Sequence, residues 1–262
     1  MIYPRCLEKN NTVVFATLAA IFGLMLAAFP SYAADNIWDG PQAVRELPMK
    51  MDRSRIFLNA ETGRGFASLK NQSATPFYVS VFLRDTDDQG EALGKTRHFF
   101  ATPASAMMRP KDTQIFHVVK RSTQKTAEDR ETLLILEIKL IPSAEQKDAS
   151  INEMMTLYLK VFSRPSELDR DGAILESTRQ MKVSRSRKDG ITGLLFTNSS
   201  PYWLTIPVID GERTDSGDRL RSAMLSPFGT YFFPQKESKN TVVVQTIDEN
   251  GFYTDPVTLA VE

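Results

Sequence analysis

The sequence predicts an all-β protein made of two antiparallel β-sandwiches, each of immunoglobulin-like size. Short apolar runs, rich in β-branched and aromatic residues, recur from residue 51 onward and are separated by Asn, Asp, Gly and Pro. We find no amphipathic helical pattern, so the alternation of strands and helices typical of a parallel sheet is missing. A chain of 262 residues, 42% of them hydrophobic, is long enough for two such domains.

The N-terminal segment, residues 1–33, is expected to be a cleavable signal peptide. Basic residues precede an unbroken apolar run, residues 12–29, and Ser31 and Ala33 occupy the small-residue positions of a cleavage site after Ala33. The apolar run is nearly long enough to span a bilayer, so an uncleaved anchor is the alternative. Pro30 and the small residues after it favour cleavage. We therefore expect an exported protein.

Cysteine usage and net charge exclude several classes of function. The only cysteine, Cys6, lies in the segment expected to be removed, so the mature chain would have no internal disulfide, no thiol nucleophile and no cysteine metal site. Lys and Arg together number 32, as do Asp and Glu, which gives a formal net charge of zero. Without an overall positive field, we expect no nucleic-acid partner.

The first predicted domain covers residues 34–165 and the second covers residues 166–262. A polar lead without a clear period, ADNIWDGPQAVRELPMK, precedes the first strands. The main apolar runs of the first domain are RIFLNA, FYVSVFL, TQIFHVV, TLLILEIKLI and MTLYLKVF. After the polar boundary SRPSELDRDG, the second domain continues with GLLFTN, YWLTIPVID, TYFFP and NTVVVQTI. About seven short strands in each half is typical of an immunoglobulin-like sandwich.

Motifs for catalysis or cofactor binding are missing from the sequence. His98 and His117 lie in strand-like segments without a nucleophile motif, so each is interpreted as a strand residue rather than a catalyst. There is no GxSxG, HExxH or Gly-rich phosphate loop. The segment DTDDQG lacks the later glutamate of a calcium loop and is interpreted as a hairpin turn. We expect no enzyme activity, no metal and no cofactor.

One segment, STRQMKVSRSRKDG, is strongly basic. Its cations are Arg179, Lys182, Arg185, Arg187 and Lys188. They could bind a polyanion or an acidic partner. The favoured interpretation is the solvated side of an edge strand, where charges discourage unwanted pairing, because the charges of the whole chain balance.

An ordered set of segments resembles the periplasmic chaperones of the chaperone–usher pilus pathway. In the first half these are DRSRIF, SLKNQSATPFYVSVFLRD, FFATPASAMMRP, DRETLLILEIKLIPS and LKVFSRP, and in the second TNSSPYWLTI, MLSPFGTYFFP and TIDENGF. Together they cover nearly all of residues 51–262. The resemblance implies two immunoglobulin-like β-sandwich domains in a boomerang arrangement, with a cleft between them. It also implies a periplasmic location and a role in fimbrium biogenesis.

The resemblance implies a carboxylate-binding pair in that cleft. In the family, an arginine from the first strand and a lysine from the last strand of the first domain hold the C-terminal carboxylate of a pilus subunit. DRSR matches this arginine at Arg55, and LKVFSRP matches the lysine at Lys160. Guanidinium and ammonium groups bind carboxylates by charge-assisted hydrogen bonds. For Lys160 alone, the alternative is a lysine that extends to solvent from a strand end.

The resemblance also implies that the strand containing Lys160 completes a subunit by donor-strand complementation. Pilus subunits of this type lack their final strand, and the chaperone lends an edge strand to replace it. The predicted donor residues share one face of the strand: Ile151, Met155, Leu157 and Leu159. Glu153, on the same face, departs from the family's apolar alternation. The alternative is packing into the chain's own core, which we expect for Met154 and Tyr158 on the opposite face.

A third implied set is an ion network between the domains. The glutamate of DRE, the arginine before the proline and an acid in the second domain match Glu131, Arg164 and Glu249. Glutamate replaces the family's usual aspartate at the last position. We expect this network to fix the angle of the cleft more than to add stability.

The implied partners are pilus subunits and an outer-membrane usher, with self-association through the exposed edge strand as a further expectation. The short connection AEQKDAS resembles that of chaperones for thick, rod-like pili. The alternative function is an exported β-sandwich fimbrial subunit or adhesin. Such a subunit would need a missing strand from outside, whereas this chain is expected to complete both domains itself. An exported enzyme on a sandwich scaffold has no catalytic constellation to support it.

Overall fold

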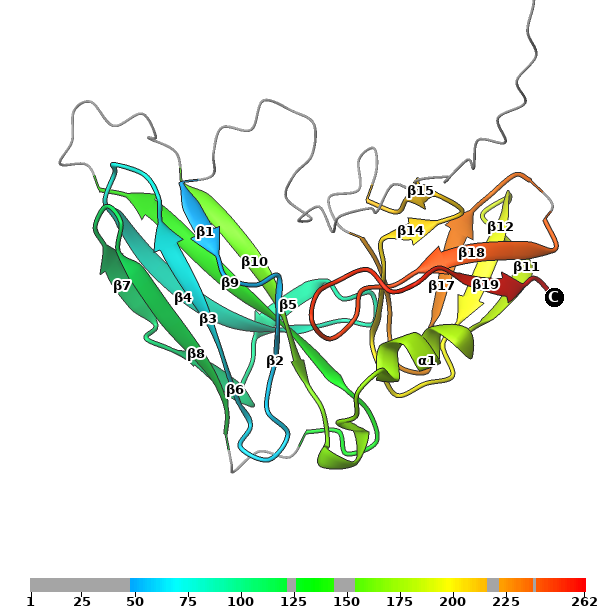
Figure 1. Cartoon of the computed structure of the whole chain (residues 1–262), viewed down its shortest axis with the longest axis horizontal. Coiled ribbons are helices and arrows are strands. Elements are labelled where there is room, and N and C mark those ends of the chain that lie inside the picture. The colour runs from blue at the N-terminus through cyan, green and yellow to red at the C-terminus, as the bar shows by residue number, and fades with distance from the viewer. Residues whose placement is uncertain (1–47, 122–125, 144–153, 216–221, 238) are drawn as a thin grey trace, which may run out of the picture. The chain divides into compact units, whose positions relative to one another are not determined.

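The structure is a computed structural model that describes residues 48–121, 126–143, 154–215, 222–237 and 239–262 (Figure 1). The predicted signal peptide, residues 1–33, lies outside the described residues, as do the lead up to residue 47, the AEQKDAS segment, Ile151 and Glu153. All described residues belong to one compact unit. Within the described ranges, no helix has the length and apolar character needed to cross a membrane.

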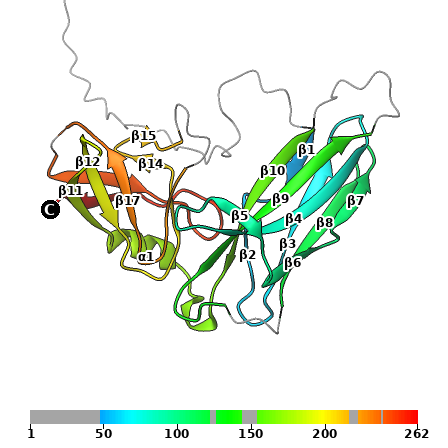
Figure 2. The ribbon, with the colours of Figure 1, turned by 180° about the vertical axis from the view of Figure 1, so that it is seen from behind.

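The N-terminal domain is a sandwich of two sheets, as the pattern of short apolar runs predicts. One sheet has the order β1-β3-β8-β6, with β1 at Met49–Met51, β3 at Arg64–Asn71, β8 at Thr113–Lys120 and β6 at Phe99–Thr102. The other has the order β2-β10-β9-β4-β5, with β2 at Arg55–Phe57, β10 at Met155–Ser163, β9 at Thr132–Pro142, β4 at Phe77–Thr86 and β5 at Ala92–Lys95. Strand β7, Ser105–Met108, also pairs with β4. Figure 2 shows β10, β9 and β4 side by side from behind.

The first segment of the domain contributes to both sheets. β1 pairs antiparallel with β3, whereas β2, a few residues later, pairs parallel with β10 in the opposite sheet. Inward-facing side chains from both sheets form a single core, which includes Leu69, Phe77, Phe116 and Leu136, each with no exposed surface. This crossing from one sheet to the other positions the start of β2 directly beside β10.

The C-terminal domain is a second, smaller β-structure with its own core. One sheet has the order β11-β12-β17, with β11 at Lys182–Lys188, β12 at Ile191–Thr197 and β17 at Thr230–Pro234. A pair is formed by β13 at Leu204–Ile206 and β16 at Ala223–Leu225. A further sheet has the order β15-β14-β18-β19, with β15 at Glu212–Arg213, β14 at Val208–Ile209, β18 at Thr241–Gln245 and β19 at Val257–Ala260. Phe196, Tyr202 and Leu225 are central to its core.

A short helical segment follows the polar boundary, where we expected no helix. A 3₁₀ turn at Ser166–Leu168 precedes α1, Ala173–Arg179. The expectation fails here because α1 has only seven residues, too few to show a helical period in the sequence. Its buried residues nevertheless fall on one side of the helix, and they are Ala173, Ile174, Ser177 and Thr178.

A small apolar cluster joins the two domains. Leu133 and Phe162 from the N-terminal domain are buried with Trp203 and Met224 from the C-terminal domain, and Phe57 packs against them. The rings of Phe57 and Phe162 are stacked with centroids 4.7 Å apart. The end of β10 therefore contacts the second domain through its side chains.

Candidate functional site

The structure brings together the two cations that the sequence predicts to bind a carboxylate. Arg55 opens β2 and Lys160 lies in β10, and their Cα atoms are direct partners in the parallel ladder. Arg55 is buried, whereas Lys160 is half-buried. Two neighbouring basic side chains at one point of a sheet are suited to bind an anion.

Arg55 also contacts the second domain through main-chain oxygens. Its Nη1 donates to the carbonyl oxygen of Ile247 at 3.3 Å and to that of Asp248 at 3.2 Å. Its guanidinium lies 5.6 Å from the centroid of the Phe162 ring. Its Nε is buried and has no hydrogen-bond partner among the described residues. One donor of the guanidinium is therefore left unsatisfied by the described residues.

The electrostatic environment keeps Arg55 charged. Burial lowers the pKa of Arg55 to about 10, and the carboxylates of Asp248, Glu131 and Glu249 limit this shift. A guanidinium with this pKa is protonated at neutral pH. Arg55 can therefore bind an anion by charge as well as by hydrogen bonding.

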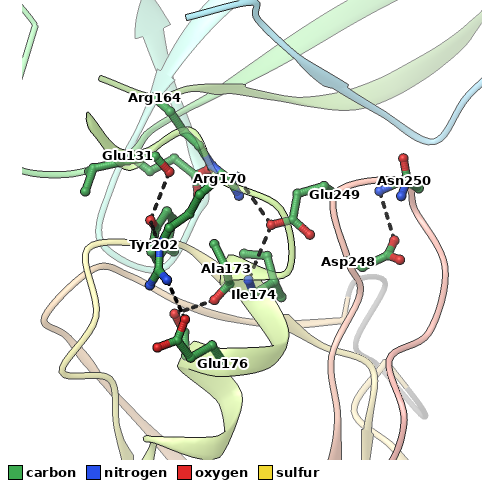
Figure 3. Close-up of polar contacts among 12 residues, drawn as sticks. Glu131, Arg164, Arg170, Ala173, Ile174, Glu176, Tyr202, Asp248, Glu249 and Asn250 are labelled. Carbon is green, nitrogen blue, oxygen red and sulfur yellow. Dashed lines mark hydrogen bonds and ion pairs between the residues drawn. The ribbon is translucent and has the colours of Figure 1, made fainter. Parts of the chain in front are cut away.

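The three residues of the predicted ion network are in contact (Figure 3). Nε of Arg164 lies 2.6 Å from Oε1 of Glu131, and Nη1 of Arg164 lies 3.3 Å from Oε1 of Glu249. The backbone N–H of Trp203 donates to Oε2 of Glu131 at 2.9 Å, and that of Ile174 donates to Oε1 of Glu249 at 3.3 Å. The network links the start of β9 and the end of β10 to two segments of the C-terminal domain.

The network is buried, which shifts the pKa values of its members. Complete burial raises the pKa of Glu131 above its ordinary value, although Arg164 and the Trp203 amide oppose the shift. Burial alone would lower the pKa of Arg164, but the carboxylates of Glu131 and Glu249 outweigh it and raise this pKa. The Arg164 guanidinium also lies 4.7 Å from the Phe57 ring centroid and 4.9 Å from that of Tyr202.

The predicted donor residues of β10 face the chain's own core. Leu159 is only 2% exposed and belongs to the N-terminal core, so its prediction as a donor side chain is corrected. It is buried because it shares the inner face of β10 with Val161. Met155 and Leu157 are half-buried and pack against the same core, and Ile151 lies outside the described residues.

The opposite face of β10 is exposed, contrary to our expectation that it would be buried. Met154 is 62% exposed and Tyr158 is 45% exposed. Side chains alternate along a strand, so burial of Leu159 and Val161 directs Tyr158 outward. The outer face of β10 becomes buried only at Phe162, where the second domain covers it.

β10 extends past the short strand beside it. The ladder between β2 and β10 covers only Lys160 to Phe162, whereas β10 begins at Met155 and pairs with β9 over its whole length. No other strand in the described part of the chain continues the sheet beside residues 155–159. This stretch is a sheet edge that can accept a further strand.

The structure reveals an apolar row that the sequence analysis missed. On the outer face of the six-stranded sheet, Tyr78 of β4 lies between Met107 of β7 and Ile141 of β9 as their cross-strand partner. Their exposed fractions are 43%, 56% and 42%. The strands that contain these residues are recognisably apolar in the sequence. The alignment of the three side chains depends on the register between strands, which the sequence does not show. We name Met107, Tyr78 and Ile141 the apolar row.

The remaining sequence candidates lie elsewhere. His98 is half-buried just before β6, and His117 is exposed on β8. No group of three or more His, Cys, Asp or Glu side chains that could hold a metal occurs among the described residues. The basic segment forms the end of α1 and β11, the first strand of its sheet in the order β11-β12-β17.

Comparisons with known proteins identify the family of this chain. Residues 48–169 match the family described as the N-terminal domain of the pili and flagellar-assembly chaperone PapD, and residues 176–257 match the C-terminal domain of the pili assembly chaperone PapD. An uncharacterized fimbrial chaperone, YqiH of Escherichia coli K12, is 29% identical over 206 residues, covering 76% of this chain and 78% of that protein. The chaperone protein FimC of the same strain is 25% identical, covering 97% of both.

Solved structures show the same fold. The SafB chaperone in complex with the SafA pilin of Salmonella enterica aligns with a TM-score of 0.67 at 16% identity, covering 83% of this chain and 98% of that one. The CupB2 chaperone of Pseudomonas aeruginosa aligns with a TM-score of 0.62 at 18% identity, covering 81% and 100%.

Proposed function

Since the chain belongs to the PapD family of pilus-assembly chaperones, we propose that it binds pilus subunits, stabilises them and delivers them to an outer-membrane usher. The observation that carries the proposal is the pairing of Arg55 with Lys160 at the edge of a sheet that can accept another strand. The role is one of binding, without a cofactor. The SafA–SafB complex, a chaperone with a pilin, supports this class of partner.

The first element of the mechanism is an anchor for the C-terminal carboxylate of a subunit. Arg55 and Lys160 would bind it together, because each supplies charge-assisted hydrogen bonds. The buried Nε of Arg55 has no acceptor among the described residues. The carbonyls of Ile247 and Asp248 hold the guanidinium from the side of the second domain, so the anchor would lie in a cleft between the domains.

The second element is donor-strand complementation along β10. The edge at residues 155–159 would supply main-chain hydrogen bonds to the incomplete subunit, a known form of strand addition. Met155 and Leu157 would enter the subunit's groove from this edge, with Ile151 further toward the start of the strand. Because the Arg55–Lys160 anchor lies at the other end of the same strand, it would fix the register of pairing.

The third element comprises the outer face of the same sheet and the junction with the second domain. The apolar row on the outer face of the same sheet would add apolar contact with the subunit. The network of Glu131, Arg164 and Glu249 would fix how the second domain is held. In free protein the same sheet edge would allow self-association.

The proposal includes a periplasmic location. Residues 1–33 would direct export and be removed, leaving a mature chain without cysteine. The structural likeness to a protein described as the periplasmic chaperone SfaE supports this location.

The test is co-purification of the chain with a co-expressed pilus subunit from its own organism. Wild type is compared with Arg55→Ala, Lys160→Ala and the exposed cation Lys188→Ala on β11 as a matched control. The anchor variants should lose a buried charge contact, which costs about 2–5 kcal/mol, and the subunit should no longer co-purify. The Lys188 variant should retain it.

A subunit truncated by its last residue separates the anchor from the strand contact. Wild-type chain should bind this truncated subunit as poorly as the anchor variants bind the complete one. Retention of the complete subunit by folded Arg55→Ala and Lys160→Ala proteins would contradict the anchor. Failure of the wild-type chain to bind any pilus subunit would contradict the proposed function itself.

A further inference from the structure

The outer face of the four-stranded sheet carries large exposed side chains that the proposed subunit site does not use. Phe66 of β3 is 46% exposed and is the cross-strand partner of His117. Ile115 is 45% exposed on the same face of β8, and Phe100 of β6 is 36% exposed. The rings of Phe66 and His117 lie 6.3 Å apart. These four side chains form the centre of what we name the basic aromatic face.

Positive charge surrounds this centre. Three cations of these strands, Lys50, Arg64 and Lys70, lie on the outer face, and the four strands contain no Asp or Glu. Two further arginines lie over the rings, with Arg53 at 4.5 Å from the centroid of Phe66 and Arg121 at 4.9 Å from that of Phe100. Asp52, at the border, is already paired with Arg53. The face therefore suits an occupant that combines negative charge with an aromatic side chain.

The segment that precedes β1 has this chemistry. Residues 34–47, ADNIWDGPQAVREL, lie outside the described residues and contain three acids against one arginine. The only tryptophan of this segment, Trp38, follows Ile37 and is flanked by Asp35 and Asp39. We name residues 34–47 the acidic lead.

The acidic lead is joined to the correct edge of the molecule. It continues into β1, which is the first strand of the sheet that carries the basic aromatic face. Neighbouring strands lie about 4.8 Å apart, so the distance from β1 across to β6 is about 14 Å. The segment from Trp38 to Pro48 can extend to roughly 33 Å, which is more than enough to cross the face.

We propose that the acidic lead folds back over the basic aromatic face, with Trp38 against Phe66 and His117 and with Asp35 and Asp39 beside the surrounding arginines. Docking there would hold β1 in place, and β1 leads directly into the strand that begins with Arg55. The outer face of the six-stranded sheet fits this lead less well, because β1, into which the lead continues, does not belong to that sheet.

Disulfide trapping tests the proposal in the full chain carrying Cys6→Ala, in which no other cysteine remains. One variant combines Gln42→Cys with Ser68→Cys, and the matched control combines Gln42→Cys with Ser80→Cys. Ser68 and Ser80 are both half-buried serines that face outward, on the four-stranded and the six-stranded sheet respectively. Docking raises the local concentration at the first site, so the pair at 42 and 68 should oxidise about tenfold faster.

Charge reversal in the lead supplies the second readout. Asp35→Lys with Asp39→Lys should slow oxidation of the pair at 42 and 68 to the rate of the control pair. Equal rates for the two pairs in the unreversed chain, or no effect of the reversal, would overturn the proposal. A disulfide-linked dimer in place of the internal disulfide would assign the face to a second copy and would also overturn it.

Discussion

Glu131 is a buried carboxylate whose two oxygens are both occupied. Oε1 accepts from Arg164 of the same domain, and Oε2 accepts from the backbone of Trp203 in the other domain. Removing two charges from water is expensive, and only good geometry with further hydrogen bonds compensates for it. Here the geometry is good. Glu131 and Arg164 each compensate for the buried charge of the other, so neither can be removed alone without cost.

Removal of one partner should therefore be more harmful than removal of both charges. Arg164→Met would leave Glu131 buried without its counter-charge, and we expect a loss of about 3–5 kcal/mol in the free energy of unfolding. Adding Glu131→Gln keeps the acceptor for Trp203 and removes the stranded charge. Urea denaturation should show the double variant to be more stable than Arg164→Met alone, and the opposite order would contradict this account.

Glu137 gives a pH dependence that can be measured. Burial alone would raise its pKa, but hydrogen bonds and charges from Arg84 and Lys139 hold the pKa below the ordinary value of 4.5. The ionised form thus stabilises the fold at pH values above 4.5, and this contribution is lost as the pH falls through the lowered pKa.

The variant Glu137→Gln should lose about 1–2 kcal/mol at pH 7 and much less at pH 3, as measured by urea midpoints. The exposed Asp255 provides the control, because Asp255→Asn should leave the pH profile of wild type unchanged. An unchanged profile for Glu137→Gln would show that its ion pairs do not matter to stability.

The sequence predicted which residues lie close together better than it predicted their surroundings. An ordered set of sequence segments pointed to two groups of residues. The structure brings together the first group, Arg55 and Lys160. It also brings together the second group, Glu131, Arg164 and Glu249. The contact of the Arg55 guanidinium with carbonyl oxygens was not predictable, since main-chain acceptors leave no mark in the sequence.

At the scale of elements, alternation along a strand predicts two faces but not which one is buried. The run LYLKVF has apolar residues on both faces, so the burial of Leu159 and the exposure of Tyr158 were assigned incorrectly. Which face is inside depends on pairing with β9 and on the core beneath it, both set by residues far away in the chain.

A glycine in β12 illustrates how closely one strand is packed against its neighbour. A Cβ added at Gly193 would lie 2.3 Å from the carbonyl oxygen of Phe233 and 2.7 Å from Cζ of Phe232. The ring of Phe232 therefore occupies the space that a side chain at Gly193 would need.

Gly193→Ala should accordingly destabilise the protein by about 1–3 kcal/mol, because backbone or ring must move to relieve the overlap. Gly94 in β5 is the matched control, since a Cβ there would have nothing within 4 Å. Gly94→Ala should change the free energy of unfolding by less than about 0.5 kcal/mol. Equal thermal midpoints for the two variants would contradict the packing argument.

At the scale of the whole molecule, the two domains share buried apolar surface. Leu133, Phe162, Trp203 and Met224 form one cluster from both sides of the junction. The same junction contains the Glu131–Arg164–Glu249 network, so packing and ion pairs act at one place. Unfolding of one domain would expose both the apolar cluster and the ion network to water. The stability of each domain therefore depends on the other.

Trp203→Ala should weaken that coupling. We expect wild type to unfold in one calorimetric transition and the variant to unfold in two, with a loss of about 3–5 kcal/mol. Phe233→Leu, a change within the core of the C-terminal domain alone, serves as the control and should lower the midpoint without splitting the transition. A single transition in the Trp203 variant would show that the domains are coupled by other contacts.

The passage of one segment through both sheets of the N-terminal domain also has a mechanical meaning. β2 runs parallel to β10, so a pull on Arg55 directed along β10 loads their ladder in shear, and the load passes through β1 to β3 in the opposite sheet. When two strands are pulled in shear, all the hydrogen bonds between them are strained at once. When one strand is pulled away from the sheet edge, these hydrogen bonds break one at a time. If a subunit is bound at Arg55 as proposed, a force that pulls it along β10 would therefore be resisted by both sheets of the N-terminal domain.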